Sequence, residues 1–327
     1  MRENRKERNI AVFEDTMAWI RQDGTLQDAV EETEKRTLFY PASGLPEGSA
    51  SRGEEAERAV FPKRYERTRV EVTAFRSFEA AVWEKRRDPE KRVAVLNFAS
   101  ATNPGGGVTK GSSAQEESLC RLSTLYPCLN TPELKKSYYD FHRQRHDALY
   151  TDACIYTPDI LVIKTDDDAP ERMEEKCWCR LDVISCAAPN LRERPSNAMN
   201  PGPSRPVRIT PEALLKLLKQ RVRRILSVAA QNREDILILG AFGCGAFRNP
   251  PETAARAWAE VLSEFYGVFA KVHFAVYCRP DDMRNYLVFD EVMNAFASDR
   301  NKKNGKPFEK GNVYETGNHR SGNKIQR

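Results

Sequence analysis

Three consecutive glycines, Gly105, Gly106 and Gly107, constrain the fold of this 327-residue chain more than any other feature. An apolar run of strand length, Val93–Phe98, precedes them, and the pair Ser112–Ser113, followed three residues later by glutamine or glutamate, predicts a capping box that opens a helix. Three glycines in a row favour a loop whose main chain something approaches closely, which we expect to be a ligand. Loops that join a strand to a helix in this way bind ligands at the carboxyl edge of α/β sheets.

The rest of the chain alternates segments of strand and helix character. Runs of strand length lie at 69–73, 160–163, 181–184, 236–239 and 272–276. The clearest helix covers 211–230, where Thr210 is the expected N-cap, Pro211 the first helical residue, and leucines, isoleucine and valine form a wide apolar stripe. This alternation predicts an α/β fold with a mixed, mainly parallel sheet flanked by helices on both faces.

We expect the chain to have three parts. Residues 1–60 form a helical N-terminal extension, with helical spacing over 10–22 and 25–38 followed by a flexible stretch, 41–58, rich in Pro, Gly, Ser and Glu. Residues 61–300 form the main domain. Residues 301–327, which have almost no apolar side chains, form a disordered polar tail.

Composition limits the class of protein. Hydrophobic residues make up 40% of the chain, enough for a sizeable core, and the sequence shows neither a signal peptide nor a membrane-spanning apolar run, so we expect no membrane partner. Its eight cysteines are typical of reduced thiols, which predicts a cytoplasmic location. The segment from 301 onward carries seven Lys or Arg and two Glu, so it alone accounts for the net charge of +5. The neutral remainder lacks the broad basic face of non-specific nucleic-acid binding, so nucleic acid is not an expected partner.

A second glycine cluster follows the run at 236–239 and precedes a helix that Pro250 and Pro251 open. Unpaired backbone amides at a helix N-terminus favour an anion, so we expect a diphosphate to bind here. A tight turn that needs flexible glycines is the structural alternative. The residues expected to form this binding loop are Gly243, Cys244, Gly245 and Ala246.

Two adjacent carboxylates, Glu116 and Glu117, follow the first glycine cluster. Neighbouring side chains on a helix diverge by about 100°, so the two cannot face one another across a scissile bond as the carboxylates of ordinary glycosidases do. One of them must do most of the proton transfer while the other positions the substrate. Acidic residues are also common in the first turn of a helix because of its dipole, but the preceding glycines favour a functional role.

Other polar residues give weaker signals. Asn97 and Asn103 flank the end of the first strand, and Asn103 is the better candidate for a ribose contact, although Asn-Pro-Gly is equally good turn chemistry. His142 and His146 have no carboxylate between them, which indicates a solvated helix face rather than a zinc site. The spacing of cysteines in 177–179 is too short for a zinc knuckle, so we expect no metal site and no cofactor.

Several of these segments together resemble the signature of microbial-type poly(ADP-ribose) glycohydrolases. The similar segments are 96–107, Gln115-Glu116-Glu117, 125–127, 182–190 and 239–250, within a region of roughly 65–280. The resemblance implies a macrodomain-like fold in which Gly105–Gly107 and Gln115 belong to the ligand site. It assigns the loop at 243–246 to the diphosphate of ADP-ribose and places Phe247 against the distal ribose. It implies that Glu117 is the acid/base, while Glu116 and Gln115 hold ribose hydroxyls or orient the loop.

The activity implied is cleavage of ribose–ribose O-glycosidic bonds in poly(ADP-ribose), without a metal and with release of ADP-ribose. Its partners would be poly(ADP-ribose) or ADP-ribosylated proteins, within the DNA damage response. Two other functions stay open at this point. One is a module that binds ADP-ribose without turnover, which the same fold permits. The other is a hydrolase of mono-ADP-ribosyl linkages.

Overall fold

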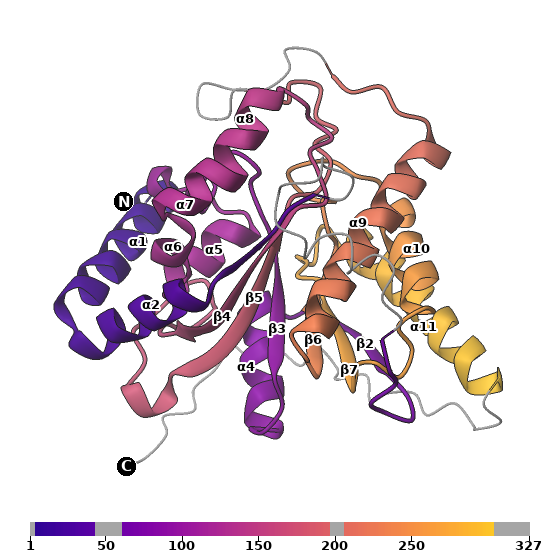
Figure 1. Ribbon diagram of the computed structural model, residues 1–327, viewed down its shortest axis with the longest axis horizontal. Helices are drawn as coiled ribbons and strands as arrows, with labels where there is room; N and C mark the ends of the chain where they lie inside the picture. The colour runs from indigo at the N-terminus through magenta and orange to yellow at the C-terminus, as the bar shows by residue number, and fades with distance from the viewer. Residues whose placement is uncertain (1–3, 43–60, 197–205, 304–327) are drawn as a thin grey trace.

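A seven-stranded sheet forms the centre of the molecule (Figure 1). The computed structural model describes residues 4–42, 61–196 and 206–303. The strands are β1 (Leu38–Tyr40), β2 (Arg69–Thr73), β3 (Val93–Phe98), β4 (Cys154–Val162), β5 (Cys179–Cys186), β6 (Ile236–Leu239) and β7 (Lys271–Ala275). Their order across the sheet is β1-β4-β5-β3-β6-β7-β2.

Most neighbouring strands are parallel. The run β5-β3-β6-β7-β2 is parallel throughout, whereas β4 pairs antiparallel with both β5 and β1. The prediction of a mixed, mainly parallel sheet is therefore confirmed.

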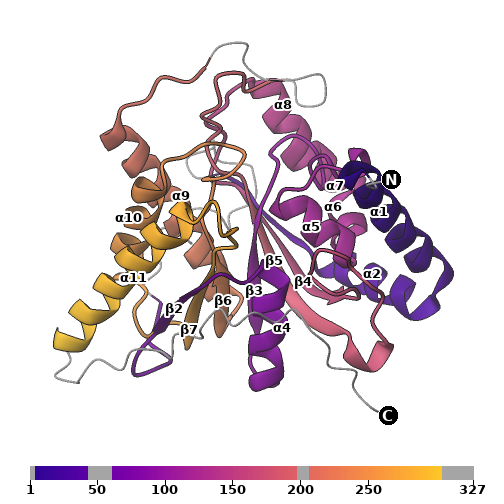
Figure 2. The ribbon, with the colours of Figure 1, turned by 180° about the vertical axis from the view of Figure 1, so that it is seen from behind.

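Helices cover both faces of the sheet. They are α1 (Arg5–Gln22), α2 (Gly24–Arg36), α4 (Ser77–Arg87), α5 (Gln115–Leu122), α6 (Leu125–Leu129), α7 (Pro132–Leu134), α8 (Phe141–Arg145), α9 (Pro211–Gln231), α10 (Pro251–Leu262) and α11 (Arg284–Lys303), with the 3-10 turns η1 (Val108–Lys110) and η3 (Glu175–Cys177) and the π-helix η2 (Lys135–Asp140). From behind, α4 lies along β3 and α11 lies beside α10 (Figure 2).

The residues of β3 show how the two faces divide. Val93 and Val95 pack with side chains of α1, α4, α5 and α6. Ala94 and Leu96 belong to the core that includes α9, α10 and α11. This alternation follows from the two-residue period of a strand, and burial on both sides explains why β3 reads as a continuous apolar run.

β3 and β6 are adjacent and parallel, yet the chain leaves them toward opposite faces. β3 leads to α5 on the α1–α4 face, and β6 leads to α10 on the α9–α11 face. Open α/β sheets bind ligands at the carboxyl ends of strands whose connections diverge in this way. The two glycine clusters are these two connections, so both lie at the same edge of the sheet.

The N-terminal part confirms the two helices expected over 10–22 and 25–38, although α1 begins already at Arg5. The chain then adds β1 to the edge of the main sheet. The flexible stretch expected at 41–58 lies mostly outside the described residues, as does the polar tail beyond 303. The helix α11 continues to Lys303, past the expected boundary at 300.

The predicted capping box at the start of α5 is wrong. Ala114 occupies the N-cap, and no side chain caps the helix. The Ser113 hydroxyl instead accepts a hydrogen bond of 2.9 Å from Arg5 of α1. Glu117, at the third helical position, turns to the backbone of Gly107. Ser113 therefore joins the start of α5 to α1, and Glu117 joins α5 to the glycine loop.

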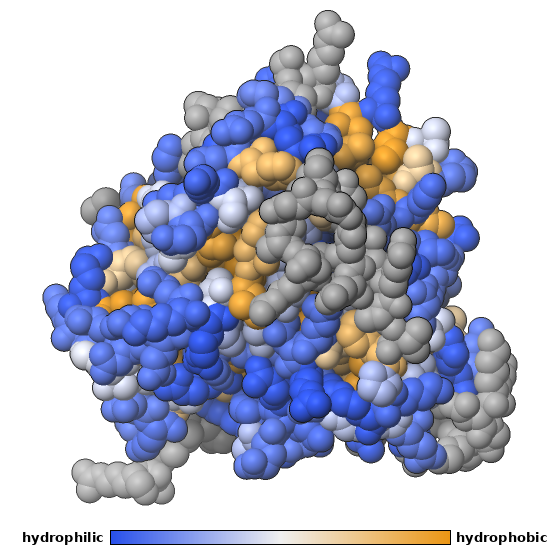
Figure 3. Space-filling model, in the orientation of Figure 1, coloured by the Kyte–Doolittle hydropathy of each residue, from blue (hydrophilic) through white to orange (hydrophobic). Residues whose placement is uncertain are grey.

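The outer surface is mainly hydrophilic on the face that Figure 3 shows, and hydrophobic residues reach it in a few separate areas. Among the described large hydrophobic side chains, the exposed ones are Tyr277, Met283 and Leu287. None of the helices in the described residues combines the length and the apolar content that crossing a bilayer requires.

Candidate active site

The β3–α5 loop, residues 99–114, wraps around the two glutamates. Gly105 and Gly106 have φ values of +64° and +59°, in the left-handed region that glycine adopts without strain. A Cβ on Gly106 would lie 2.6 Å from Glu117 Oε1 and 3.0 Å from Glu116 Oε2, and one on Gly105 would lie 2.8 Å from the Tyr126 ring. The groups that approach this main chain most closely are therefore the protein's own Ser112 hydroxyl at Gly107, the two carboxylates and the Tyr126 ring, where the sequence predicted a ligand.

Glu116 is buried and held by the end of β3. Its Oε2 accepts a hydrogen bond of 2.7 Å from the backbone amide of Ser100, and its Oε1 accepts one of 3.4 Å from Asn97 Nδ2. Burial, together with the adjacent charge of Glu117, raises the pKa of Glu116 well above the usual range of a glutamate. Protein groups thus engage both oxygens of this carboxyl.

Glu117 has one oxygen that no protein group uses. Its Oε1 accepts a hydrogen bond of 2.9 Å from the amide of Gly107. Its Oε2 is buried and has no hydrogen-bond partner within the described residues. A buried carboxylate oxygen without a partner is unfavourable unless another molecule completes it. Within the described residues, Oε2 of Glu117 is therefore the oxygen of this pair of carboxyls that no protein group engages.

Gln115 ties the start of α5 to the sheet. Its Oε1 accepts a hydrogen bond of 2.8 Å from the amide of Phe98, and its Nε2 donates to Leu96 O at 2.8 Å and to Ser77 Oγ at 3.0 Å. Both polar atoms of the side chain are thus engaged with β3 and α4. Of the two roles that the sequence left open for Gln115, these bonds favour orientation of the loop.

Asn97 has a structural task at the end of β3. It is fully buried, and its Nδ2 donates to Ser185 Oγ at 2.9 Å as well as to Glu116. A polar residue inside an otherwise apolar strand was the sequence signal for this role. The contribution of Ser100 comes from its backbone amide, so no side-chain pattern was able to reveal it.

Asn103 lies just before the three glycines in the β3–α5 loop. Its Nδ2 donates to Thr102 Oγ1 at 3.2 Å, and its Oδ1 accepts from Arg143 Nη2 at 3.2 Å. Arg143 belongs to α8 and is itself paired with Asp140 at 2.6 Å. The structure therefore connects the predicted ribose contact to α8, a link that the sequence did not predict.

The β6–α10 loop, residues 240–250, is fixed by Gly243 and Asn249. Gly243 has a φ of +77°, and a Cβ there would lie 2.5 Å from Asn249 Nδ2. Asn249 Nδ2 donates to Gly243 O at 3.1 Å and to Pro189 O at 2.7 Å. Position 243 therefore needs a glycine, because the Asn249 side chain that holds the loop occupies the space a Cβ would take.

The outer part of this loop presents unpaired donors. The backbone amides of Gly245, Ala246 and Phe247 make no hydrogen bond to any described residue. Gly245 is exposed, and a Cβ there would meet nothing within 4 Å. The loop runs into the N-terminus of α10, whose dipole favours negative charge. These features suit the diphosphate that the sequence predicted for this loop.

Cys244 and Phe247 have different surroundings. Burial raises the pKa of Cys244 to about 12, so its thiol stays protonated at neutral pH and is not an activated nucleophile. The Phe247 ring lies 6.0 Å from that of Tyr150, and the guanidinium of Arg192 lies 5.9 Å from its centroid. Phe247 thus belongs to a partly exposed group of rings beside the unpaired amides.

The two loops meet through aromatic side chains. Phe98, the last residue of β3, packs edge-to-face on Phe242 of the β6–α10 loop, with ring centroids 5.8 Å apart. A Cβ on Gly240 would lie 2.9 Å from the Phe98 ring, so this glycine gives the ring its space. The structure therefore brings the carboxylates and the β6–α10 loop to one edge of the sheet, as the sequence predicted.

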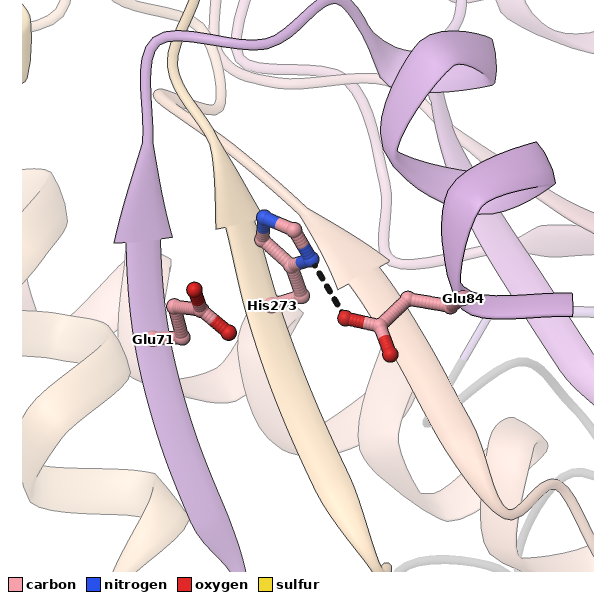
Figure 4. A group of neighbouring side chains, drawn as sticks. All are labelled: Glu71, Glu84 and His273. Atoms are coloured by element: carbon pink, nitrogen blue, oxygen red, sulfur yellow. Dashed lines mark hydrogen bonds and ion pairs between the residues drawn. The ribbon is translucent and has the colours of Figure 1, made fainter. Parts of the chain in front are cut away.

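One group of described side chains elsewhere has possible metal ligands close together. Glu71, Glu84 and His273 each place one ligand atom within 4.8 Å of the others (Figure 4). Lys271 Nζ lies 2.5 Å from both Glu71 Oε2 and Glu84 Oε1. His273 forms hydrogen bonds of 2.8 Å to Glu84 and to Thr73. The ammonium group of Lys271 thus already pairs with both carboxylates, and the cluster forms an ion-pair network joining β2, β7 and α4.

His142 does not lie on a solvated helix face, so that prediction is wrong. It is 2% exposed, and its ring nitrogens lie 2.7 Å from Tyr138 O and 2.8 Å from Thr151 Oγ1. The π-helix η2 precedes α8 and shifts the helical register, which turns His142 inward. Burial, with the nearby charges of Arg221 and Arg145, lowers the pKa of His142 to about 4.

We expect acid to destabilise the fold through His142. The unfolded chain takes up this proton below about pH 6.5 and the folded chain only below about pH 4, so stability that is complete at pH 7 is lost as the pH falls through that window. Urea denaturation at pH 7.0 and at pH 4.5 gives the decrease in the free energy of unfolding between the two pH values. This decrease should be about 2 kcal/mol smaller for His142→Gln than for the wild type. His146→Gln, at an exposed neighbouring position, is the control. Equal losses in His142→Gln and wild type would contradict this account.

Comparisons with known proteins agree with this arrangement. The sequence profile of the microbial-type poly(ADP-ribose) glycohydrolase (PARG) catalytic domain matches residues 12–165. The poly(ADP-ribose) glycohydrolase of Deinococcus radiodurans, solved in complex with ADP-ribose, is 34% identical, with 81% of this chain and 97% of that chain covered and a TM-score of 0.66. The enzyme of Thermomonospora curvata, bound to the inhibitor ADP-HPD, is 28% identical over 86% of this chain and 98% of that chain, with a TM-score of 0.70. No curated protein sequence matches the chain. The fold, the two loops and these similarities together show that the chain belongs to the microbial-type poly(ADP-ribose) glycohydrolase family.

Proposed function

We propose that this protein cleaves the ribose–ribose O-glycosidic bonds of poly(ADP-ribose) and releases ADP-ribose, with Glu117 as the acid/base. The observation that carries the proposal is the buried, unpartnered Oε2 of Glu117, at the same sheet edge as the free amides of the β6–α10 loop. Membership of the family and the ADP-ribose complex of the Deinococcus relative support it. Poly(ADP-ribose) or ADP-ribosylated proteins as partners, a cytoplasmic location and a role in the DNA damage response are further proposals, drawn from the resemblance and the composition.

The chemistry follows from the two halves of the site. The free amides at 245–247 and the N-terminus of α10 would hold the diphosphate, which places the distal ribose toward the β3–α5 loop. Glu117 would protonate the departing ribose oxygen as the anomeric carbon becomes oxocarbenium-like, and the negative diphosphate would help to stabilise that charge. The same carboxylate then takes a proton from the attacking water. No metal and no cofactor takes part in this proposal.

An activity assay separates this function from the two alternatives. Purified protein is incubated with automodified polymer and, in parallel, with mono-ADP-ribosylated protein and nucleic acid, and the products are separated by chromatography. Release of free ADP-ribose from the polymer supports the proposal. Release from mono-ADP-ribosylated substrates alone would select a mono-ADP-ribosyl hydrolase, and binding of ADP-ribose without any release would select a reader.

The diphosphate loop has its own test at Gly245. Because a side chain fits there without a clash, Gly245→Glu adds a negative charge beside the unpaired amides and leaves the loop intact. We expect its affinity for ADP-ribose to fall by about a hundredfold or more through charge repulsion. Calorimetric titration measures the change, and Gly245→Gln, of equal size but uncharged, should lose much less. Equal affinity of Gly245→Glu and the wild type would remove this loop from the site.

A further inference from the structure

Helix α1 contacts the β3–α5 loop just before the glutamates. Asn9 Nδ2 donates a hydrogen bond of 3.0 Å to Gly111 O. Gly111, with a φ of +74°, lies so close to α1 that a Cβ there would overlap the carbonyl oxygen of Lys6. Arg5 Nη2 donates to Ser113 Oγ at 2.9 Å. The last part of the loop therefore rests on the first turns of α1.

Two more contacts join α1 to α5 and α6, the two helices that follow the loop. Phe13 is 6% exposed and packs edge-to-face on Tyr126, with ring centroids 4.9 Å apart. The Tyr126 ring in turn lies against Gly105. Thr16 Oγ1 donates a buried hydrogen bond of 2.6 Å to the carbonyl of Arg121 near the end of α5. Helix α1 thus contacts the end of the loop and the helices behind it, and it reaches Gly105 through the Tyr126 ring.

The helix α1 is also fixed independently of that segment. Lys164, just after β4, is 2% exposed, donates to Val12 O at 2.8 Å and pairs with Asp15 at 2.7 Å. Arg172 pairs with the same carboxylate at 2.6 Å. The hydrogen bond from Arg172, together with the hydrogen bond from Lys164 and both positive charges, lowers the pKa of Asp15 to about 2, so this ion-pair group persists at neutral pH. The support that α1 offers to the loop is therefore itself anchored to the sheet.

We propose that α1 is a positioning element of the reaction, and that Asn9 is a positioning residue that holds the β3–α5 loop so that the Gly107 amide aims Glu117. The proposal rests on the proposed function for its kinetic part. The path is short: Asn9 holds Gly111, whose amide donates to Val108 O at 3.1 Å, and the Ser112 amide donates to Gly107 O at 3.2 Å. Gly107 N then holds Glu117 Oε1 at 2.9 Å. A misplacement of a catalytic group by about 1 Å lowers rates by up to about a hundredfold, so loosening this path should affect turnover before it affects binding.

The test uses the full-length chain with Asn9→Ala, and with Asn9→Asp, which keeps the shape but turns a carboxylate toward Gly111 O. Glu14→Ala, at an exposed position on the same helix, is the matched control. Hydrogen exchange measures how well the amides of 105–113 are protected. Calorimetry gives the affinity for ADP-ribose and the number of intact binding sites, and turnover of polymer is expressed per intact site. This correction removes any effect of a smaller folded fraction.

For Asn9→Ala we expect faster exchange at 105–113 and a kcat about tenfold lower, the effect of one hydrogen bond, with KM and ADP-ribose affinity within about twofold of the wild type. Asn9→Asp should show a larger effect and Glu14→Ala none. Unchanged exchange in Asn9→Ala would overturn the positioning role, as would an equal loss of kcat and affinity, which indicates general destabilisation. If the wild type releases nothing from polymer while Asn9→Ala still loosens the loop, the proposed function fails and the structural role of α1 stands.

Discussion

Glu117→Gln should lower the turnover of polymer by roughly 10² to 10⁴, the range for loss of general acid/base help, while the affinity for ADP-ribose stays within a few fold. The amide keeps an oxygen that accepts from Gly107 N, so the loop keeps its shape. It cannot pass a proton to the departing oxygen. Single-turnover rates with defined polymer and calorimetry with ADP-ribose give the two numbers.

Glu116→Gln is the matched variant for this comparison. Burial favours the neutral form of Glu116, and an amide resembles that form. The turnover rate of Glu116→Gln should therefore be at least tenfold higher than that of Glu117→Gln. The opposite order would assign proton transfer to Glu116. Near wild-type turnover in Glu117→Gln would show that Glu117 is not the acid/base, and a wild type that binds ADP-ribose but releases none from any substrate would be a reader.

Gly106→Ala should lower kcat by about a hundredfold or more although it adds a single methyl group. Its Cβ would lie 2.6 Å from Glu117 Oε1 and 3.0 Å from Glu116 Oε2, so both carboxylates must shift. The φ of +59° adds about 1 to 2 kcal/mol of backbone strain for a residue that has a Cβ. Turnover per ADP-ribose binding site, counted by calorimetry, measures the effect apart from any loss of folded protein.

Gly24→Ala is the control for the change from glycine to alanine, because a Cβ at Gly24 would meet nothing within 4 Å. It should keep wild-type turnover. If Gly106→Ala also kept wild-type turnover in a folded protein, the close contact between the glycine loop and the carboxylates would have no part in catalysis.

The fold was largely predictable where strands are buried on both faces. The apolar runs at 93–98 and 236–239 coincide with β3 and β6. In β4, by contrast, only the end near 160–163 was recognised. The chain is irregular between Thr157 and Ile160, where Asp159 adopts a φ of +52°, so the polar residues there break the apolar run although the strand continues. The strand β1 is three residues long, too short for any pattern to stand out.

The site was predictable where the chemistry lies in side chains that are neighbours in sequence. Glycines followed by Glu116 and Glu117 indicate such a site directly, and the structure brings them to the edge shared with the second glycine loop. No sequence pattern indicates that the backbone amide of Ser100 donates a hydrogen bond to Glu116. The bond between Asn9 and Gly111 joins residues 102 positions apart, so only the folded chain reveals it.

The departure of the β3 and β6 connections toward opposite faces has a consequence for how this protein changes over time. The β6–α10 loop, which we propose holds the anion, is supported by α10, and the glutamates, which we propose move the proton, are supported by α1 and α5. Substitutions in one set and in its supporting helices are therefore able to accumulate while the other set keeps its geometry. If Glu117 is the acid/base as proposed, substituting it alone leaves the proposed ADP-ribose site intact, so one mutational step would separate a hydrolase that removes the modification from a protein that only binds it. On the same proposal, a variant with the unaltered β6–α10 loop and a substituted Glu117 would serve as an affinity reagent for the polymer.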